Sequence, residues 1–292
     1  MKLPAKKTHT YYRYAAIYFA ALFLISAILM TIALQFSASE MKKTSVQNAE
    51  SNMQQAAELL DRQLQTMQDI ALKVSMQIDY RPYRVKQGGV YDINLLERFK
   101  QYANYSPLAG QYFLVYKSVR KIYTSAGTTS YFNYYAPYEL NMSYELTSEV
   151  LERILAAERP YFELSDDAIL AVFPVRFSGY TESRAYHAML CFVLTEKQLQ
   201  DYITQTTAAM PEGYEVAVNG TTLFRVGETE RTGESLLSVS SADGKVAVGT
   251  GSDFSGWRLL FAHGGWVIAA GIAVSLLLAV ASALTMAHYS LR

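Results

Sequence analysis

The chain has 292 residues, a formal net charge of zero and a hydrophobic content of 51%. A neutral chain whose basic residues cluster only at its N-terminus excludes a nucleic-acid-binding surface, and its single cysteine excludes an internal disulfide. Four scattered histidines with one cysteine form no recognisable metal-ligand spacing, so neither a metal nor another cofactor is predicted.

The first predicted element is a membrane-spanning helix at residues 15–36, which contain no charged residue. A helix of about 20 apolar residues crosses the hydrocarbon layer of a bilayer. Positive charges in residues 1–14 favour a cytoplasmic N-terminus. The alternative is a signal peptide cleaved at residues 37–39, but the apolar segment is longer than the usual core of about 7 to 15 residues.

A long amphipathic helix is predicted to continue this span through residues 37–80. Apolar residues recur there at steps of three and four, with polar residues on the opposite face. They are Val46, Ala49, Met53, Ala56, Leu60, Leu64, Met67, Ala71, Val74 and Ile78. No Gly or Pro interrupts the helix before Arg81-Pro82, which ends it because a residue before proline avoids the helical conformation. The stripe is expected to pack on the following domain, and the alternative is that part of it also serves as a homodimer seam.

Residues 81–210 are predicted to form a first folded module, in which Asp92 is the N-cap of a short helix. A second capped helix is expected at residues 147–157. Runs of β-branched and aromatic residues predict strands at residues 111–117, 121–125, 161–164, 168–177 and 185–195. Pro174 marks an edge or a bulge in its strand, since proline cannot donate a ladder hydrogen bond.

A second, smaller module is predicted at residues 211–263, after a connecting helix at residues 196–207. The pairs Asn219-Gly220 and Asp243-Gly244 each predict a two-residue hairpin turn, in which both positions need a positive φ. Residues 257–261 predict a last strand that leads toward the membrane. The module is therefore expected to be a small antiparallel sheet.

A second membrane span is predicted at residues 264–287, because no charged residue lies between Arg258 and Arg292. The two spans place residues 37–263 outside the cell, and residues 288–292 return to the cytoplasm. The sequence thus predicts an α+β protein of the cell membrane, with both termini cytoplasmic and both spans in contact with membrane lipid.

The order of these elements resembles that of double Cache receptors, whose two extracytoplasmic modules are PAS-like. Local segments strengthen the resemblance, and they are LLDRQLQTMQDIALKVS, FLVYKSVRKIYTSAG, ILAVFPVRF and AMLCFVLTEKQLQDYI. They are similar to the sensor regions of membrane-anchored AraC-type regulators and related sensor histidine kinases of Gram-positive bacteria. The resemblance covers nearly the whole chain.

The resemblance implies a membrane-distal module that binds a small molecule and a cytoplasmic output that responds, either a DNA-binding regulator or a histidine kinase. Two features depart from the family's pattern. No output domain occurs before Arg292, so the output is expected in a longer chain or in a partner. The Tyr, Arg, Trp and Tyr combination of the amino-acid-sensing receptors is not found intact, so amino acids are not favoured as ligands.

The best candidate for a ligand site is a loop at residues 125–144 that is crowded with aromatic rings. The hydroxyl groups of these rings cannot all be buried without partners, so a concave surface lined by them suits a sugar, an aromatic compound or a peptide. Charged residues that flank the central strands could hold a charged ligand group. The predicted ligand-binding residues are Tyr123, Tyr131, Tyr134, Tyr135, Tyr138, Asp167, Arg176 and Tyr186. The alternative is a lid of rings that only packs over the sheet.

No HExxH, GxSxG, Walker or CxxC motif occurs, so the chain is not predicted to be an enzyme. The leading hypothesis is a receptor that forms a homodimer through the long helix and the membrane spans, binds a small molecule and transmits a conformational change across the membrane. An alternative is an extracellular domain that binds another protein or the cell wall, which predicts an exposed apolar patch. An extracytoplasmic enzyme is a third hypothesis and would require titratable residues that converge in a cleft.

Overall fold

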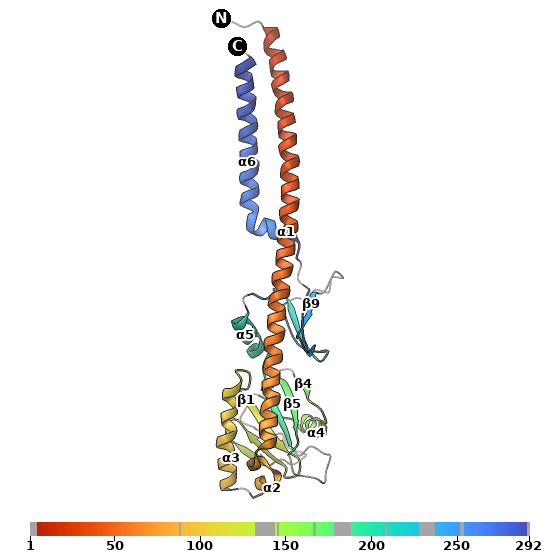
Figure 1. Ribbon diagram of the computed structural model, residues 1–292, viewed down its shortest axis with the longest axis vertical. Coiled ribbons are helices and arrows are strands. Elements are labelled where there is room, and N and C mark those ends of the chain that lie inside the picture. Colours follow the sequence, from red (N-terminus) through yellow and green to blue (C-terminus); the bar gives the residue numbers. More distant parts are fainter. Residues whose placement is uncertain are drawn as a thin grey trace. The chain divides into compact units, whose positions relative to one another are not determined.

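The computed structural model describes residues 5–87, 89–131, 144, 146–165, 168–177, 188–207, 209–227, 237–251 and 254–290. The chain divides into two compact units, one of residues 1–48 and 253–292 and the other of residues 49–252. We call them the two-helix unit and the α+β unit. Helix α1, Ala5–Met76, contributes to both units (Figure 1).

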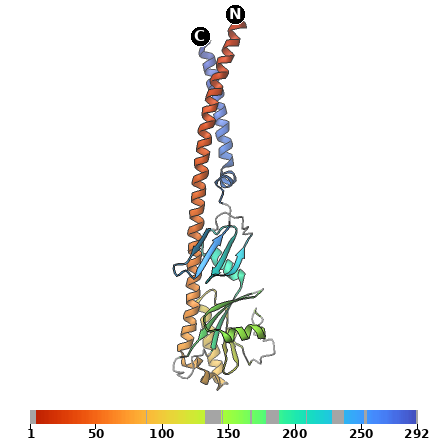
Figure 2. The same ribbon diagram turned by 90° about the vertical axis from the view of Figure 1, so that its right-hand side faces the viewer.

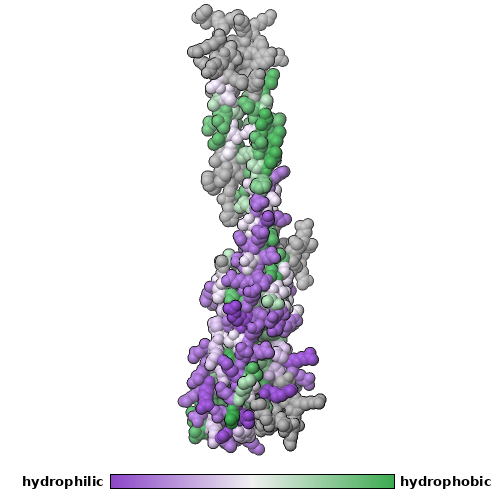
Figure 3. All heavy atoms as spheres, in the orientation of Figure 1, coloured by the Kyte–Doolittle hydropathy of each residue, from purple (hydrophilic) through white to green (hydrophobic). Residues whose placement is uncertain are grey.

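The two-helix unit consists of the first part of α1 and of helix α6, Gly256–Ser290. The helices approach so closely that a Cβ atom on Gly256 would overlap the carbonyl oxygen of Ala38. Exposed apolar side chains are frequent on α1 between Ile17 and Phe36 and on α6 between Ile272 and Val280, and Figure 3 shows apolar surface in the upper part of the molecule. Among the described residues, the part of α1 from Phe19 onward is long and apolar enough to cross a membrane, and α6 contains a shorter apolar stretch, Gly271–Ser282. The topology with two spans stays a prediction.

The prediction of a strand at residues 257–261 is wrong. These residues form the first turns of α6, in one helix with the apolar sequence that follows. Their aromatic and branched side chains favoured a strand locally. In the structure Gly256 is the first residue of α6, and the helix continues from there without a break to Ser290.

In the α+β unit, α1 is buried along the predicted apolar stripe. Met53, Ala56, Met67 and Val74 are fully buried. The predicted continuous helix is confirmed, because α1 is one helix of 72 residues. It ends at Met76, a few residues before the predicted end.

The chain between α1 and strand β1, Gln111–Tyr116, is largely helical. Gln77 is extended, and a single turn at Ile78–Tyr80 leads into helix α2, Pro82–Val85. Pro82 occupies the first turn of α2, where its missing N–H costs nothing. Helix α3, Val90–Lys100, and a turn at Gln101–Tyr105 follow.

The larger sheet of the α+β unit has six antiparallel strands in the order β3-β2-β1-β6-β5-β4. The strands are β1 Gln111–Tyr116, β2 Lys121–Thr124, β3 Thr129–Tyr131, β4 Tyr161–Leu164, β5 Ile169–Val175 and β6 Ala188–Leu194. Helices α1 and α3 cover one face with residues such as Ile70 and Phe99. Helix α4, Ser148–Ala156, covers the other face with residues such as Leu151, and Thr147 caps it as predicted.

The smaller sheet has four antiparallel strands in the order β8-β7-β10-β9 (Figure 2). The strands are β7 Tyr214–Val218, β8 Thr221–Val226, β9 Leu237–Ser240 and β10 Val246–Thr250. Helix α5, Glu196–Thr206, precedes them and begins with a capping box formed by Thr195 and Gln198.

The two predicted hairpin turns differ in geometry. Asn219 and Gly220 have φ values of 50° and 81°, as a two-residue turn requires. In the second hairpin only Gly244 has a positive φ, of 69°. There the Ser241 N–H donates to Val246 O over 2.8 Å, so the turn is longer than the predicted one. Asp243 instead accepts a hydrogen bond from Gln65 of α1 at 3.3 Å.

Both sheets share one hydrophobic core along α1. Leu60 and Leu64 of α1 meet Leu199 of α5 and Val216 of β7 around a void of only about 10 Å³. Such dense packing carries a displacement from one element to its neighbours. The predicted module boundary near residue 210 stays a prediction.

Candidate functional site

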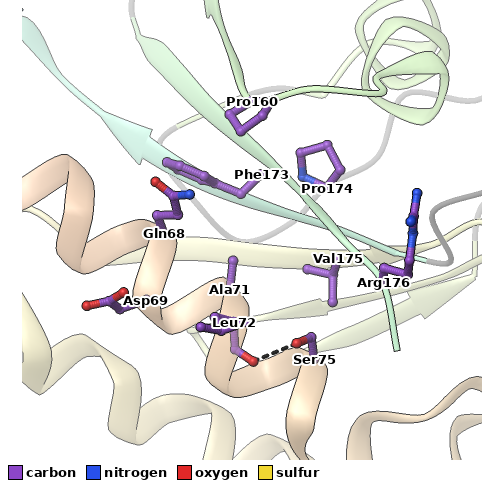
Figure 4. Close-up of a pocket in the computed structure, with 10 residues that line it drawn as sticks. All are labelled: Gln68, Asp69, Ala71, Leu72, Ser75, Pro160, Phe173, Pro174, Val175 and Arg176. Carbon is purple, nitrogen blue, oxygen red and sulfur yellow. Dashed lines mark hydrogen bonds between the residues drawn. The ribbon is translucent and has the colours of Figure 1, made fainter. Parts of the chain in front are cut away.

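A groove of about 290 Å³ lies between helix α1 and strand β5 of the α+β unit (Figure 4). One wall comes from α1, with Gln68, Leu72 and Ser75, and the other includes Phe173 and Arg176 at the end of β5. At roughly 30 Å³ for each water molecule, the groove has room for about ten waters. It can therefore hold a small organic molecule.

The groove exists because β4 covers only part of β5. The pairing runs from Leu164 with Ile169 to Tyr161 with Val172, and no described strand pairs with β5 beyond that point on this side. Pro174 lies on this free edge, as its sequence position predicted, and it has no N–H to donate to an added strand. The edge is thus better suited to a small molecule than to an extended peptide.

The surface of the groove is apolar with charged groups from both walls. Leu72 is 53% exposed, so it adds an apolar side chain to the wall formed by α1. The charged residues are Asp69 of α1 and Arg176, which directly follows β5. The hydroxyl of Ser75 donates to Leu72 O at 2.7 Å, so Arg176 is the lining group best suited to an anion. A guanidinium binds a carboxylate through two parallel hydrogen bonds.

A buried ion pair lies at β2, toward the opposite edge of the six-stranded sheet from β5. Lys121 of β2 is only 1% exposed, and its Nζ atom donates to Asp92 Oδ2 of α3 at 2.5 Å. The hydroxyl of Tyr123 donates to Asp92 Oδ1 at 2.6 Å. Both carboxylate oxygens therefore have donors, as a buried charge requires.

The predicted role of Asp92 as an N-cap is wrong. Gly89 holds the cap position of α3, with a φ of 63°, and Asp92 lies in the first turn. A carboxylate is favourable in that turn as well, because of the helix dipole. The side chain of Asp92 turns to Lys121 and Tyr123 because a buried ammonium ion needs a counter-charge. The three residues join α3 to β2.

Buried tyrosines join the sheet to the segment that follows α1. The hydroxyl of Tyr116 donates to Tyr80 O at 2.6 Å. The ring of Tyr116 stacks on Phe177 with centroids 6.1 Å apart and meets Tyr123 edge-on at 5.8 Å. Burial raises the pKa of Tyr116 well above its ordinary value. These rings therefore belong to the close-packed hydrophobic core.

A second pair of tyrosines lies on the α4 face of the sheet. Neither the hydroxyl of Tyr144 nor that of Tyr161 has a hydrogen-bond partner among the described residues. Burial, together with the charge of Glu163, raises the pKa of Tyr144 to about 12. A buried hydroxyl without a partner costs about 1–3 kcal/mol. Tyr144 is the last residue of the ring-rich loop, so a polar group supplied there would relieve this cost.

The predicted ligand-binding residues fall in different places. Arg176 lines the groove, whereas Tyr123 is fully buried with its hydroxyl on Asp92. Tyr131 is in β3, where its backbone is paired with that of Lys121 in β2. Its side chain is not among the described side chains. The other predicted residues lie outside the described residues, and they are Tyr134, Tyr135, Tyr138, Asp167 and Tyr186.

The sequence interpretation missed the contribution of α1 to the groove. An exposed Leu72 between polar residues of the outer helix face was the available signal. Among the residues that the structure describes, no group of three or more His, Cys, Asp or Glu side chains could hold a metal ion.

No family model and no curated protein matches the chain. The chain is similar to the sensory domain of the Campylobacter jejuni chemoreceptor Tlp3 with isoleucine bound, at 10% identity and a TM-score of 0.43, over 74% of this chain and 95% of that chain. It is similar to the periplasmic domain of Vibrio cholerae LuxQ at 10% identity and a TM-score of 0.41, over 69% and 96%. An extracellular ligand binding receptor from Desulfohalobium retbaense has 11% identity and a TM-score of 0.35, over 72% and 39%. At such low identities and TM-scores, these similarities identify neither the fold family nor a ligand.

Proposed function

We propose that the chain is the membrane-anchored, ligand-sensing part of a bacterial signal-transduction receptor, with residues 37–263 outside the cytoplasm. One observation supports this most. The groove beside β5 is bordered by α1, and α1 continues without interruption into the apolar segment that is long enough to cross a membrane. Whatever occupies the groove therefore contacts the element that leads to the membrane.

Sensing in this way requires no chemical reaction. A ligand that prefers one position of α1 against β5 shifts the population toward that position by its difference in affinity. Met67, Ala71 and Val74 pack α1 tightly against the core next to the groove. Because a densely packed interior does not deform continuously, a change at the groove moves the helix as a whole.

The ligand that suits the groove is an amphipathic small molecule with one anionic group. Leu72, Phe173 and Val175 supply apolar contacts, and Arg176 supplies a site for a carboxylate. Asp69 disfavours a second negative charge on the ligand, because like charges repel. The ring-rich loop is proposed as a further ligand-contacting region, since the nearby Tyr144 hydroxyl has no partner among the described residues.

The membrane topology and the output complete the proposal. The basic residues before the first span favour a cytoplasmic N-terminus, and α6 is proposed as a second span because its long apolar sequence carries no charge. The output is proposed to be a DNA-binding regulator of the AraC type or a histidine kinase, on the resemblance of the sequence alone. A homodimer through α1 and the membrane helices is proposed because apolar side chains of α1 between Ile17 and Phe36 are exposed in a single chain.

The test uses the full chain in lipid nanodiscs, with phenylacetate, hexanoate and glucuronate as probes and their uncharged amides as controls. We expect at least one carboxylate to raise the unfolding temperature, because binding at 100 times Kd adds about 2.7 kcal/mol of stability. The Arg176→Ala variant should lose this response. The Arg225→Ala variant is the matched control, since Arg225 is an exposed arginine of β8 that pairs with Glu215 at 3.0 Å.

A second pair of variants tests the groove itself. Leu72→Arg should fill it and abolish the response, whereas Met76→Arg changes an exposed residue of the same helix outside the groove lining and should leave the response intact. A carboxylate response that survives both Arg176→Ala and Leu72→Arg would place the ligand elsewhere. The absence of any response to the whole panel would overturn the proposed function.

A further inference from the structure

Helices α2 and α3 present a cluster of exposed apolar and aromatic side chains. Val90 is 72% exposed and Ile93 is 60% exposed, and Tyr83 and Tyr91 are also exposed. We call these residues, together with Arg84, the α2–α3 surface. The buried side of α3 is formed by other residues, such as Phe99. Exposed apolar residues that gather in one place mark an interaction site, whereas scattered ones need no explanation.

Arg84 lies over both aromatic rings of this surface. Its guanidinium is 5.7 Å from the centroid of the Tyr83 ring and 5.4 Å from that of the Tyr91 ring. These contacts hold the side chains of Arg84, Tyr83 and Tyr91 in one arrangement. The binding of a partner therefore loses less side-chain entropy at this surface. Tyrosine and arginine are the residue types that most often dominate the energy of protein interfaces.

The charge around this surface is positive. Two acidic residues nearby are already paired, since Asp79 forms an ion pair with Arg98 and Asp92 forms one with Lys121. Glu97 of α3 is a third acidic residue and is exposed. Basic residues remain in excess in this part of the chain, and they are Arg81, Arg84, Lys86 and Lys100. A partner with negative charge is attracted to such a surface and associates faster.

We propose that the α2–α3 surface docks an acidic protein that differs from this chain. A second copy would bring Arg84 and its basic neighbours against the same residues in a symmetric interface, which like charges oppose. A glycan would need open ring faces, but Arg84 lies over both rings. The branched side chains of Val90 and Ile93 instead match the apolar centre of a protein interface.

The test places a photo-reactive benzoylphenylalanine at Ile93 in the full chain, expressed in the cells that carry its gene. Irradiation is expected to give an adduct with one other protein, joined at a peptide rich in Asp or Glu and apolar residues. Arg84→Glu in the same chain should reduce the adduct at least tenfold. The same group at Leu164, an exposed apolar residue of β4, is the matched control and should give no such adduct.

Reconstitution then decides the proposal. The purified cross-linked protein should bind the full chain in nanodiscs, and Arg84→Glu should weaken that binding at least tenfold without lowering the unfolding temperature. An adduct with the same chain, an adduct that Arg84→Glu leaves unchanged, or binding of this surface to vesicles of anionic lipid in place of a protein would overturn it. The response of Arg84→Glu to groove carboxylates should stay normal, which separates this outcome from the sensing proposal.

Discussion

The two sheets of the α+β unit bury their strands in different ways. Every residue of β6 in the six-stranded sheet is buried. In β7 of the four-stranded sheet, buried and partly exposed residues alternate. The reason is the number of covered faces, because α1 with α3 and α4 enclose the larger sheet, whereas the smaller sheet packs its one apolar face toward α1. A sheet that is covered on both faces can bury polar groups that would be exposed to solvent in a sheet covered on one face.

The charged and polar groups described above are distributed in keeping with this difference in burial. The ion pair of Asp92 with Lys121 and the groove belong to the larger sheet. So does the Tyr144 hydroxyl, which has no hydrogen-bond partner among the described residues. Among the described residues of the smaller sheet and its turns, the buried polar groups are the neutral Ser241 and Thr250. The larger sheet is therefore the part that is built around polar groups, and the smaller one connects it to the rest of the chain.

The largest expected effect comes from breaking the buried ion pair. Asp92→Ala should lower the free energy of unfolding by about 3–5 kcal/mol, because it leaves the buried Lys121 ammonium without its carboxylate. Urea unfolding of the full chain in nanodiscs measures this change. The double variant Asp92→Leu with Lys121→Met should recover most of the loss, since it removes both charges. A single variant as stable as the native protein would contradict the role given to this pair.

Adjacent positions in one strand test the two kinds of burial directly. In β6, Leu190→Ala should cost about 2–5 kcal/mol, and Cys191→Ser on the opposite face about 1–3 kcal/mol for the buried hydroxyl. In β7, Val216→Ala should also destabilise the protein, but its neighbour Ala217→Ser should change stability by less than about 0.5 kcal/mol. Equal costs at both β7 positions would show that the smaller sheet is covered on both faces.

Two tyrosines on opposite faces of the larger sheet provide a finer test. Tyr116→Phe should cost about 0.5–1.5 kcal/mol, because it removes the hydrogen bond to Tyr80 O. Tyr144→Phe should be neutral or stabilising, since its buried hydroxyl has no partner among the described residues. Thermal unfolding of both variants measures the contrast. A clear loss in Tyr144→Phe would mean that its hydroxyl does have a partner.

The smallest effect is expected in the dependence of stability on alkaline pH. Burial raises the native pKa of Tyr144 to about 12, above the ordinary value of about 10 for an unfolded tyrosine. Between these values the native state binds more protons than the unfolded state, so stability falls as the pH rises. Unfolding at pH 9 to 11.5 should show this fall, and Tyr144→Phe should make it shallower. An identical slope in the variant would show that the group titrates normally.

Much of the fold could be predicted from local sequence patterns. The apolar stripe of α1, with no Gly or Pro to interrupt it, predicted one continuous helix. Asn219-Gly220 predicted a tight turn, and Thr147 predicted a helix start. Each of these signals acts within a few residues of chain, so no knowledge of distant contacts was needed.

The candidate site was far less predictable, because its residues come together from separate parts of the chain. Arg176 was predicted to bind a ligand and lines the groove, but the groove residues Leu72 and Ser75 lie about a hundred residues earlier in the chain. Asp92 is a residue type that is common at helix N-caps. In the structure it is instead the counter-ion of Lys121. Tyr123 was predicted to bind a ligand, but its hydroxyl donates a hydrogen bond to Asp92 in the core.

The sequence by itself determined where helices and turns form, because periodicity, proline and positive φ act locally. Only the tertiary structure decided that residues 257–261 continue a helix, that β4 stops short and opens a groove beside β5, and that a lysine is buried with a carboxylate. These outcomes depend on packing between segments far apart in the chain. Burial and pairing are properties of that packing, and no local pattern specifies them.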